Sequence, residues 1–550
     1  MKARPPVQSA SSRWPLARWL IVSLMLVGVF FRIATLDQRV YWVDEVATSV
    51  RASGYPLATV VEQVTTGAEL SRDDLLQYQR LSPERTWSDT LSALSQNPEH
   101  APLYFLIVRG WAEWFGSSVV AIRSLSVGFG LLVLPALYGL CQRLFSAPVG
   151  GMAVALFSVS PFFVAYAQEA RPYSLWTLLL VLSCGSLLSA LERDRALDWL
   201  AYALAATLGL YTSILTTPVL LAQGLYVGLL RWPRSKGQSL VLGDRVSHYL
   251  LVVGSAIALF SPWLWVIYQQ RSLLQANVVW MQQPLSPALI VGTWLYSLVI
   301  LFFDCPVVPE PSVALAVEAA IALAVLGLLG AAFFHLCRTA PRRVWLLLIA
   351  FSLSTLVPLA LIDLITGGQA SATPRYLIPA QLGGLIAVAH WLTTSPWRRR
   401  LAAGLIGLSL VSCWVGLAHT PDYLKTRSRS NGAIAARLGQ ASNPLLIAES
   451  AQTFDLLSLS HSLRDPIGIR ILPMPQLPTD LDLCRPTFLL SPSAALQTNL
   501  PTNARLEPAY QPRLLTAEDR HLALWQLISG DPLPDEPQYR GRRDCAEPQR

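Results

Sequence analysis

Long runs of apolar residues, separated by short polar segments, dominate the chain as far as His419. The first run extends from Trp19 to Leu36, and the later ones cover 119–141, 149–167, 173–191, 198–212, 213–230, 248–268, 313–336, 344–364, 376–394 and 401–418. A helix needs roughly 18 or more apolar residues to cross a bilayer, so the pattern predicts about eleven transmembrane helices. Because lipid excludes open sheets, we expect an all-α polytopic membrane protein.

Two further apolar segments do not fit as spans. Residues 102–116, PLYFLIVRGWAEWFG, contain Arg109 and Glu113, and a span over 285–303 would break the alternation of charge between successive loops. We expect both segments to form helices in the outer membrane interface, with Trp and Tyr side chains at headgroup depth. Ordinary spans are the alternative.

The composition agrees with a membrane protein. Hydrophobic residues make up 53% of the chain, charged residues only 14%, and the mean hydropathy is +0.42. A soluble protein would carry about a quarter charged residues. Seven cysteines occur without a CxxC pair, so the sequence suggests no zinc site.

The net charge of +8 is explained by topology rather than by nucleic acid. Basic residues gather in short loops such as RWPRSKGQ, CRTAPRR and SPWRRR, which places these loops in the cytoplasm. The basic N-terminus precedes a run too long for a signal peptide, so we expect an uncleaved first helix with a cytoplasmic start. The first loop, 37–118, then lies outside, and a bacterial inner or plasma membrane is the expected location.

After residue 419 the composition becomes more polar. The bursts PLLIAES and PTFLLSP have the length of strands, and NGAIAARLG predicts a helix that ends at Gly439. We therefore expect a transmembrane domain over 1–419 and a small extracytoplasmic α/β domain over 420–530. Residues 531–550 are too polar and Pro-rich to pack, which predicts a flexible tail.

Four stretches carry the polar residues that point to chemistry. In chain order they are YWVDEVATS, NPEHAPLYFLIVRGWAEWFGSSVVAIRSLS, PFFVAYAQEARPYSLWTLLLVLS and ATPRYLIPAQLGGLIAVA. Together they resemble the membrane glycosyltransferases of the GT-C class, nearest to the family 39-like enzymes that include protein O-mannosyltransferases and lipid A aminoarabinose transferases. The resemblance covers about residues 15–420. One departure is His100-Ala101-Pro102, where the family has His-Pro-Pro; Pro102 still suits the first turn of a helix.

The resemblance implies an inverting glycosyltransferase. Such an enzyme moves a hexosyl or pentosyl unit from a polyprenyl-phosphate donor to a hydroxyl of a glycan, lipid or protein acceptor. A carboxylate within hydrogen-bond reach takes the proton of the attacking hydroxyl, and Asp44, beside Glu45, is the candidate catalytic base. The departing phosphate needs positive charge. The expected donor-phosphate residues are Arg375, Arg171 and His100, with Glu169, Tyr173 and Tyr376 in support.

A divalent metal at Asp44 is possible on the same resemblance, because some GT-C enzymes use one and others do not. The sequence places no second convergent carboxylate there, so this question stays open. No other cofactor is expected.

Each assignment has a plainer alternative. Asp44 and Glu45 also suit a solvated pair after a helix end, and Glu169 and Arg171 suit a local ion pair. Arg375 suits a headgroup anchor, and His100 suits a helix cap. For the whole protein, the rivals are a transporter or flippase of lipid-linked sugars, and a scaffold with a degenerate catalytic face. Against a transporter, the sequence shows no internal repeat.

Overall fold

The computed structural model describes residues 14–230, 239–304, 313–418, 427–482, 485–501, 504–512 and 522–529. Its contacts divide the chain into two compact units. The first unit consists of Met1–Asp37, Leu94–Trp111 and Val120–Thr420. The second consists of Gln38–Ala93, Ala112–Val119 and Pro421–Arg550, so it combines two long stretches that are far apart in the sequence.

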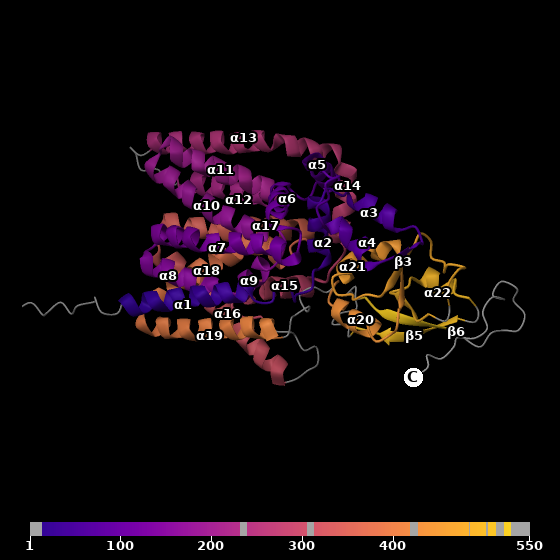
Figure 1. Ribbon diagram of the computed structural model, residues 1–550. Helices are drawn as coiled ribbons and strands as arrows, with labels where there is room; N and C mark the ends of the chain where they lie inside the picture. The colour runs from indigo at the N-terminus through magenta and orange to yellow at the C-terminus, as the bar shows by residue number, and fades with distance from the viewer. Residues whose placement is uncertain are drawn as a thin grey trace, which may run out of the picture. The chain divides into compact units, whose positions relative to one another are not determined.

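The described part of the first unit is a helical assembly (Figure 1). Its helices are α1 (Trp14–Ile33), α7 (Val119–Leu144), α8 (Ala147–Ser158), α9 (Pro161–Ala167), α10 (Tyr173–Arg193), α11 (Ala196–Thr212), α12 (Thr216–Leu230), α13 (Ser239–Gln269), α14 (Arg271–Val278), η3 (Val279–Gln282), α15 (Pro287–Val299), α16 (Val313–Thr339), α17 (Arg342–Thr366), η4 (Pro374–Leu377), α18 (Ile378–Thr393) and α19 (Pro396–Ala418). Helix α6 (Leu103–Phe115) begins in this unit.

Seven helices within the described residues are long and apolar enough to cross a membrane. They are Val119–Leu144, Tyr173–Arg193, Arg245–Gln269, Val313–Thr339, Arg342–Thr366, Pro374–Thr393 and Pro396–Ala418. The pair α8 and α9 makes an eighth if it counts as one span, but it bends by 62° at its break. The chain is therefore an integral membrane protein, and it is mostly helical, as the apolar runs predicted.

Two expected spans form helices shorter than a straight crossing needs, since α11 and α12 contain 17 and 15 residues. Helices α6 and α15, expected in the interface, contain 13 residues each. A straight crossing needs about 20 residues. The count of about eleven spans therefore stays a prediction, as does the interfacial location of α6 and α15.

Helix α1 lies very close to α8. A Cβ on Gly28 would overlap the carbonyl of Ser158, so only glycine allows this approach. Arg32, 1% exposed, then donates from Nη1 to the carbonyls of Gly28 at 2.9 Å and Ser158 at 2.5 Å, and from Nη2 to Phe157 at 3.1 Å. The otherwise costly buried guanidinium thus joins the two helices through their backbones.

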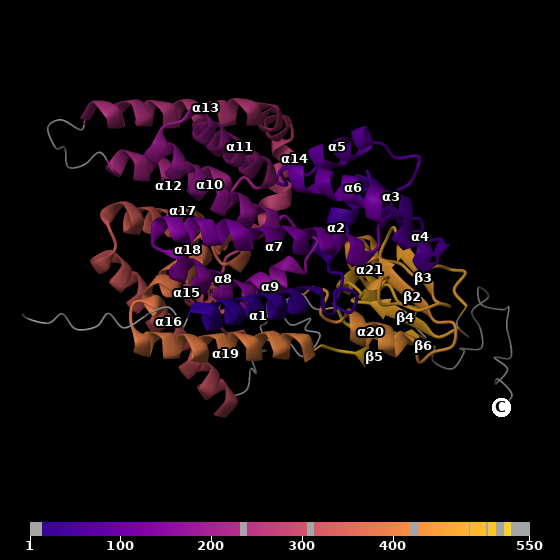
Figure 2. The same cartoon turned by 60° about the vertical axis from the view of Figure 1, so that its left-hand side comes forward.

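Helices α10, α11, α12 and α13 lie side by side in both ribbon views (Figure 2). A buried polar chain connects three of their side chains. The Tyr202 hydroxyl donates to Gln223 at 2.8 Å, and the Gln223 amide donates to the Ser183 hydroxyl at 2.7 Å. Each group is hydrogen-bonded inside an apolar core, as burial of polar atoms requires.

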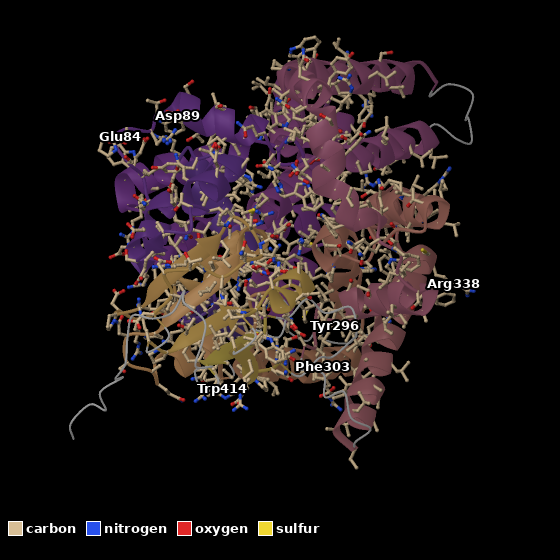
Figure 3. All side chains as sticks on the ribbon, turned by 90° about the vertical axis from the view of Figure 1, so that its right-hand side faces the viewer. Glu84, Asp89, Tyr296, Phe303, Arg338 and Trp414 are labelled. Carbon is tan, nitrogen blue, oxygen red and sulfur yellow. The ribbon has the colours of Figure 1, made fainter. Side chains whose placement is uncertain are left out.

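The outward side chains of this unit are largely apolar. Trp414 on α19 is 61% exposed, as lipid contact would allow. At the end of α16, Arg338 extends outward (Figure 3), with its guanidinium 4.6 Å from the ring centroid of Phe334. This cation–π contact holds the charge at the helix end.

The second unit is built on a six-stranded mixed sheet. Its helices are α2 (Val43–Ala52), α3 (Leu57–Val64), α4 (Arg72–Leu76), η2 (Gln77–Gln79), α5 (Trp87–Ser95, which extends into the first unit), α20 (Asn431–Leu438), η6 (Ser450–Gln452), α21 (Thr453–Leu459) and α22 (Ala494–Thr498). Its strands are β1 (Glu69–Leu70), β2 (Leu445–Glu449), β3 (Gly468–Leu472), β4 (Thr487–Leu490), β5 (Ala504–Tyr510) and β6 (Leu524–Ser529). The order is β1-β3-β2-β4-β6-β5, with β2 parallel to β3 and β4 and the remaining pairs antiparallel.

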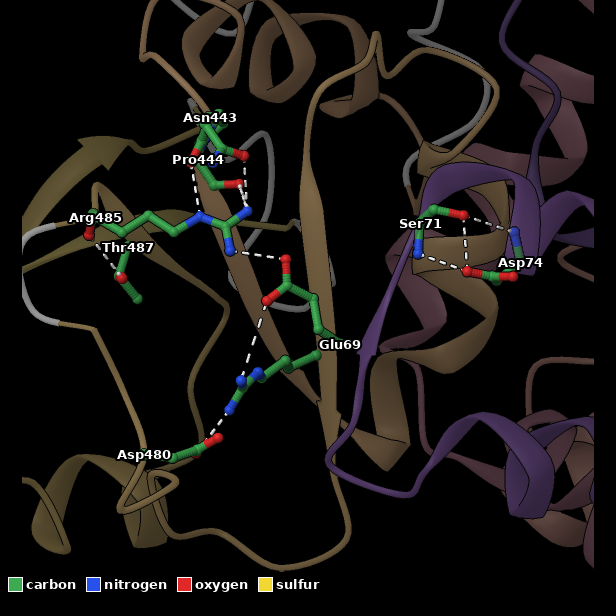
Figure 4. Close-up of polar contacts among 9 residues, drawn as sticks. Glu69, Ser71, Asp74, Asn443, Pro444, Asp480, Arg485 and Thr487 are labelled. Atoms are coloured by element: carbon green, nitrogen blue, oxygen red, sulfur yellow. Dashed lines mark hydrogen bonds and ion pairs between the residues drawn. The ribbon is translucent and has the colours of Figure 1, made fainter.

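Strand β1 comes from the first loop and pairs with β3 near the C-terminal end of the chain. Glu69 fixes this pairing through Arg485, whose Nη1 donates to it at 2.7 Å, and Arg470, at 4.0 Å (Figure 4). Arg470 also donates to Asp480 at 2.8 Å. A Cβ on Gly468 would overlap the Glu69 carboxylate, so the bare glycine makes room for this cluster.

The structure has strands and a helix where the sequence predicted them in this region. The burst PLLIAES contains β2, PTFLLSP contains β4, and α20 ends at Leu438 with Gly439 as its C-cap. Residues 530–550 lie outside the described residues, and the predicted tail falls among them.

Candidate functional site

Arg375 lies in the short turn η4, directly before α18. The loop leading to it is fixed by Asp363, a 4% exposed residue near the end of α17. This carboxylate accepts from the backbone amides of Ala370 and Ser371, both at 2.7 Å, and from the Ser371 hydroxyl. Trp294 on α15 donates to the same hydroxyl at 3.0 Å. The buried Asp363 carboxylate therefore holds the loop before Arg375 in place.

Arg171 lies in the tight turn before α10 and is 3% exposed. Its backbone amide donates to the carbonyl of Glu169 at 2.8 Å. Its own carbonyl accepts from Ser126 Oγ at 3.4 Å, and Ser126 is hydrogen-bonded to the Tyr104 hydroxyl at 2.7 Å. The turn that presents Arg171 is thus tied to α6 and α7.

The two arginines meet at one aromatic ring. The guanidinium carbons of Arg171 and Arg375 each lie 5.9 Å from the ring centroid of Tyr173, and Arg375 lies 5.6 Å from that of Tyr376. An aromatic face attracts a cation at this range. Both guanidiniums therefore neighbour the same ring, and anions nearby would offset their like charges.

Glu169 and Tyr166 complete this arginine cluster. Tyr166, on α9, interacts with the charges of both Glu169 and Arg375 and is hydrogen-bonded to Arg375. Glu169 is 5% exposed. The structure thus brings together five residues expected from the sequence, namely Glu169, Arg171, Tyr173, Arg375 and Tyr376. For Glu169 and Arg171, a local ion pair stays the alternative to a role in the site.

His100 lies before α6, in a different set of contacts. Its Nε2 is 3.8 Å from Glu99 Oε1, and its ring centroid is 5.8 Å from that of Phe105. Asn277 donates to both oxygens of Glu99 at 3.2 Å. The assignment of His100 to the donor phosphate therefore stays a prediction.

Asp44 and Glu45 belong to the second unit, in the first turn of α2. Acidic residues are favoured there by the helix dipole. Glu45 is fully buried, whereas Asp44 is partly exposed. Only the latter carboxylate is accessible to a substrate in this conformation.

A cation stands near Asp44. Arg427 makes a two-pronged contact with Asp455, from Nε to Oδ1 at 2.8 Å and from Nη2 to Oδ2 at 3.1 Å. Burial lowers the pKa of Arg427, but the hydrogen bonds and charge of Asp455, with the charge of Asp44, raise it overall. The motifs in the sequence did not identify Arg427, because it is far from Asp44 along the chain.

The possible metal at Asp44 finds no ligand set. Across the described residues, no three or more His, Cys, Asp or Glu side chains come together in a way that could hold a metal ion. No step proposed below therefore passes through a metal.

The sequence analysis did not single out the buried residues Arg32 and Arg123. Arg32 binds the carbonyls of α8, and Arg123 on α7, 1% exposed, donates to the carbonyl of Leu36 at 2.6 Å. The signal was present, because charged residues within spans are rare and have a specific role. Here the carbonyl partners indicate a structural role.

Residues 99–266 match the family model described as dolichyl-phosphate-mannose-protein mannosyltransferase. None of the curated proteins compared with the chain matches it. Among solved structures, the oligosaccharyltransferase of Archaeoglobus fulgidus tethered with an acceptor peptide is 13% identical, with 82% of this chain and 64% of that chain covered and a TM-score of 0.42. The chain thus spans less than two thirds of that relative.

Two other solved structures resemble the chain. ArnT of Cupriavidus metallidurans is 15% identical, covers 94% of this chain and 98% of its own, and has a TM-score of 0.38. The S. cerevisiae Pmt1-Pmt2 complex is 15% identical over 47% of this chain and 34% of that chain, with a TM-score of 0.29. Scores below 0.5 establish no shared reaction. The family match is to membrane glycosyltransferases of the GT-C class, and it confirms the resemblance that the sequence motifs carry.

Proposed function

We propose that the protein is an inverting membrane glycosyltransferase. It moves a hexosyl or pentosyl unit from a polyprenyl-phosphate donor to a hydroxyl group of a glycan, lipid or protein acceptor. The observation that carries the proposal is the arginine cluster, in which Arg171 and Arg375 both lie 5.9 Å from Tyr173. Two guanidiniums at one ring suit an anionic group with several oxygens, such as a phosphate.

In the proposed reaction, the acceptor oxygen attacks the anomeric carbon of the sugar. Its proton passes to the Asp44 carboxylate, which is the partly exposed member of the acidic pair. The bond between the anomeric carbon and the phosphate oxygen breaks, and its electron pair leaves with the phosphate. The products are the glycoside and the polyprenyl phosphate, and a single displacement inverts the anomeric centre.

The phosphate gains negative charge as it departs. Arg375 and Arg171 offset that charge, and their planar guanidiniums can each donate two parallel hydrogen bonds. Tyr173 and Tyr376 hold the arginines, Glu169 offsets their charge while the donor is absent, and Tyr166 is hydrogen-bonded to Arg375. Preorganised donors of this kind do not have to reorient during the reaction.

The proposal includes a topology. The N-terminus and the SPWRRR loop are cytoplasmic, about eleven helices cross the membrane, and the 37–118 loop and the 420–530 α/β domain are extracytoplasmic. A bacterial inner or plasma membrane is the proposed location. Cysteine substitutions at Ser71 and Ser395 should react with an impermeant reagent from opposite sides, and labelling from one side would contradict this arrangement.

The second candidate, a transporter or flippase of lipid-linked sugars, is favoured by the same cluster, because an arginine pair also suits transport of a phosphate. Proteoliposomes separate the two functions. Undecaprenyl phosphate and dolichol phosphate, bound in solved structures of ArnT and an archaeal oligosaccharyltransferase, are the carriers to test. Transfer separates labelled sugar from its carrier, whereas flipping moves the intact lipid between leaflets.

A further inference from the structure

Helix α2, which carries Asp44, lacks a side-chain cap of its own. Its N-cap residue is Trp42, which makes no capping hydrogen bond through its side chain. The first amides of a helix have no partner within it. Here the amide of Val43 donates to the hydroxyl of Ser428 at 3.3 Å. A residue far along the chain thus supplies the missing acceptor.

A network of small polar groups supports this cap. The Ser458 hydroxyl, on α21, donates to the Tyr41 carbonyl at 2.6 Å and lies 3.2 Å from the Ser428 hydroxyl. Asn431 donates to Ser458 at 2.9 Å. All of these groups are buried. The start of α2 is therefore fixed against the turn before α20 and against α21.

This arrangement also determines where Arg427 lies. It is the neighbour of Ser428, just as Asp44 is the neighbour of Val43, so the hydrogen bond between Val43 and Ser428 brings the two charged residues close. Asp455, whose side chain is 7% exposed, holds the guanidinium by Nε and Nη2. The Arg427 side chain remains 44% exposed.

We propose that Arg427, anchored by Asp455, positions the Asp44 carboxylate for proton abstraction. The proposal rests on the function proposed above and assigns the C-terminal segment a part in it. Arg427 is a positioning residue, since it acts through Asp44. The buried anchor matters because an arginine held at two points loses little further freedom when it orients a second carboxylate.

The activity test compares variants of the full-length protein in detergent with a labelled polyprenyl-phosphate sugar. Arg427→Ala should lower kcat by about 10- to 100-fold, as expected for a misplaced reacting group, and leave the donor KM within about threefold. Arg427→Lys keeps the charge and should recover part of the loss. Asp455→Asn should lower kcat in the parent and add little to Arg427→Ala, because both act through one contact.

Arg437→Ala is the matched control. Arg437 belongs to the same segment, and its Nη1 donates to Gln440 at 2.7 Å, away from α2. It should behave as the parent does. Equal loss in Arg427→Ala and Arg427→Lys, together with a lowered melting temperature in both, would indicate a purely structural role and overturn the proposal.

A double-mutant cycle measured by melting temperature tests the interaction of Arg427 with Asp44 without an activity assay. The melting-temperature shifts of Asp44→Ala and Arg427→Ala should not add in the double variant, whereas additive shifts would overturn the proposal. Asp44→Asn, measured in parallel, separates the two claims. An inactive Asp44→Asn with a parent-like Arg427→Ala overturns only the role of Arg427. An active Asp44→Asn, or a parent that transfers no sugar, overturns the proposed function, and the role of Arg427 with it.

Discussion

The guanidinium carbon of Arg375 lies 5.9 Å from the centre of the Tyr173 ring, although Tyr173 begins α10 and Arg375 lies in η4, about 200 positions later in the sequence. Arg171 lies at the same distance from that ring. Tyr173 is therefore the element that holds both cations of the proposed phosphate site.

The first prediction concerns the Tyr173 ring. Tyr173→Phe keeps the aromatic face and should retain donor use within about threefold, since each cation–π contact contributes roughly 0.5–2 kcal/mol. Tyr173→Leu removes the face and should raise the donor KM about tenfold, which corresponds to about 1.4 kcal/mol. Steady-state kinetics with a labelled donor measures both. Equal behaviour of the two variants would show that the ring does not hold the arginines.

The second concerns the planar group of Arg375. Arg375→Lys keeps the charge but loses the fork that matches phosphate oxygens, so donor use should fall clearly, and further in Arg375→Ala. The acceptor KM should change little in either variant. Arg338, which stacks on Phe334 at the end of α16, provides the matched control, and Arg338→Ala should be neutral. Normal donor use in both Arg375 variants would pass the phosphate role to Arg171.

The third concerns the loop before Arg375. Asp363→Asn replaces one accepting oxygen by an NH₂ group, which cannot accept from the amide of Ala370 or Ser371. A buried donor left without its acceptor costs about 1–3 kcal/mol, so the melting temperature should fall and the donor KM should rise. Ile365→Ala, on an 81% exposed side chain of the same helix, is the control. A lowered melting temperature with unchanged donor KM would separate the loop from the site.

The sequence predicted the parts of the fold that depend on local pattern. Continuous apolar runs predicted the long helices, and turn residues around PLLIAES and PTFLLSP predicted β2 and β4. It did not predict β1, because Glu69 and Leu70 form only a two-residue strand. Their pairing depends on Arg470 and Arg485, which lie about 400 residues later. Such long-range contacts leave no local periodicity.

The candidate site, too, was predicted only in part from the sequence. The QEARPY and PRYLIP motifs identified Arg171, Tyr173, Arg375 and Tyr376, and the structure gathers them, although their roles stay predictions. Tyr166 lies in the stretch PFFVAYAQEARPY but was not singled out as a site residue. Arg427 lies outside all four stretches and reaches its cluster only through folding.

The fourth prediction concerns pH and the first loop. Hydrogen bonds from the Ser71 side chain and backbone, at 2.7 and 2.8 Å, lower the pKa of Asp74 below its usual value of about 3.9. A lowered folded pKa means that the cap stabilises the folded loop above about pH 4 and is lost as the pH falls through the folded pKa. Amide exchange at residues 71–76, expressed as protection, should be constant from pH 7 to about 5 and fall at lower pH.

Asp74→Asn provides the comparison for this effect. It should lack the acid-dependent loss of protection, whereas Asp73→Asn, whose residue takes no part in the cap, should keep it. The same acid-dependent loss in Asp74→Asn would assign the titration to another group.

The most direct test of the central claim is the transfer reaction of the purified protein with a radiolabelled polyprenyl-phosphate sugar, compared between the parent and Asp44→Asn. The amide cannot accept the proton of the attacking hydroxyl, and loss of a general base lowers a rate by about 10²- to 10⁴-fold. We expect the parent to release the sugar from its carrier and the folded Asp44→Asn variant to release it about 10²- to 10⁴-fold more slowly. Release at the parent rate by Asp44→Asn, or no release by the parent from any carrier, would contradict the account.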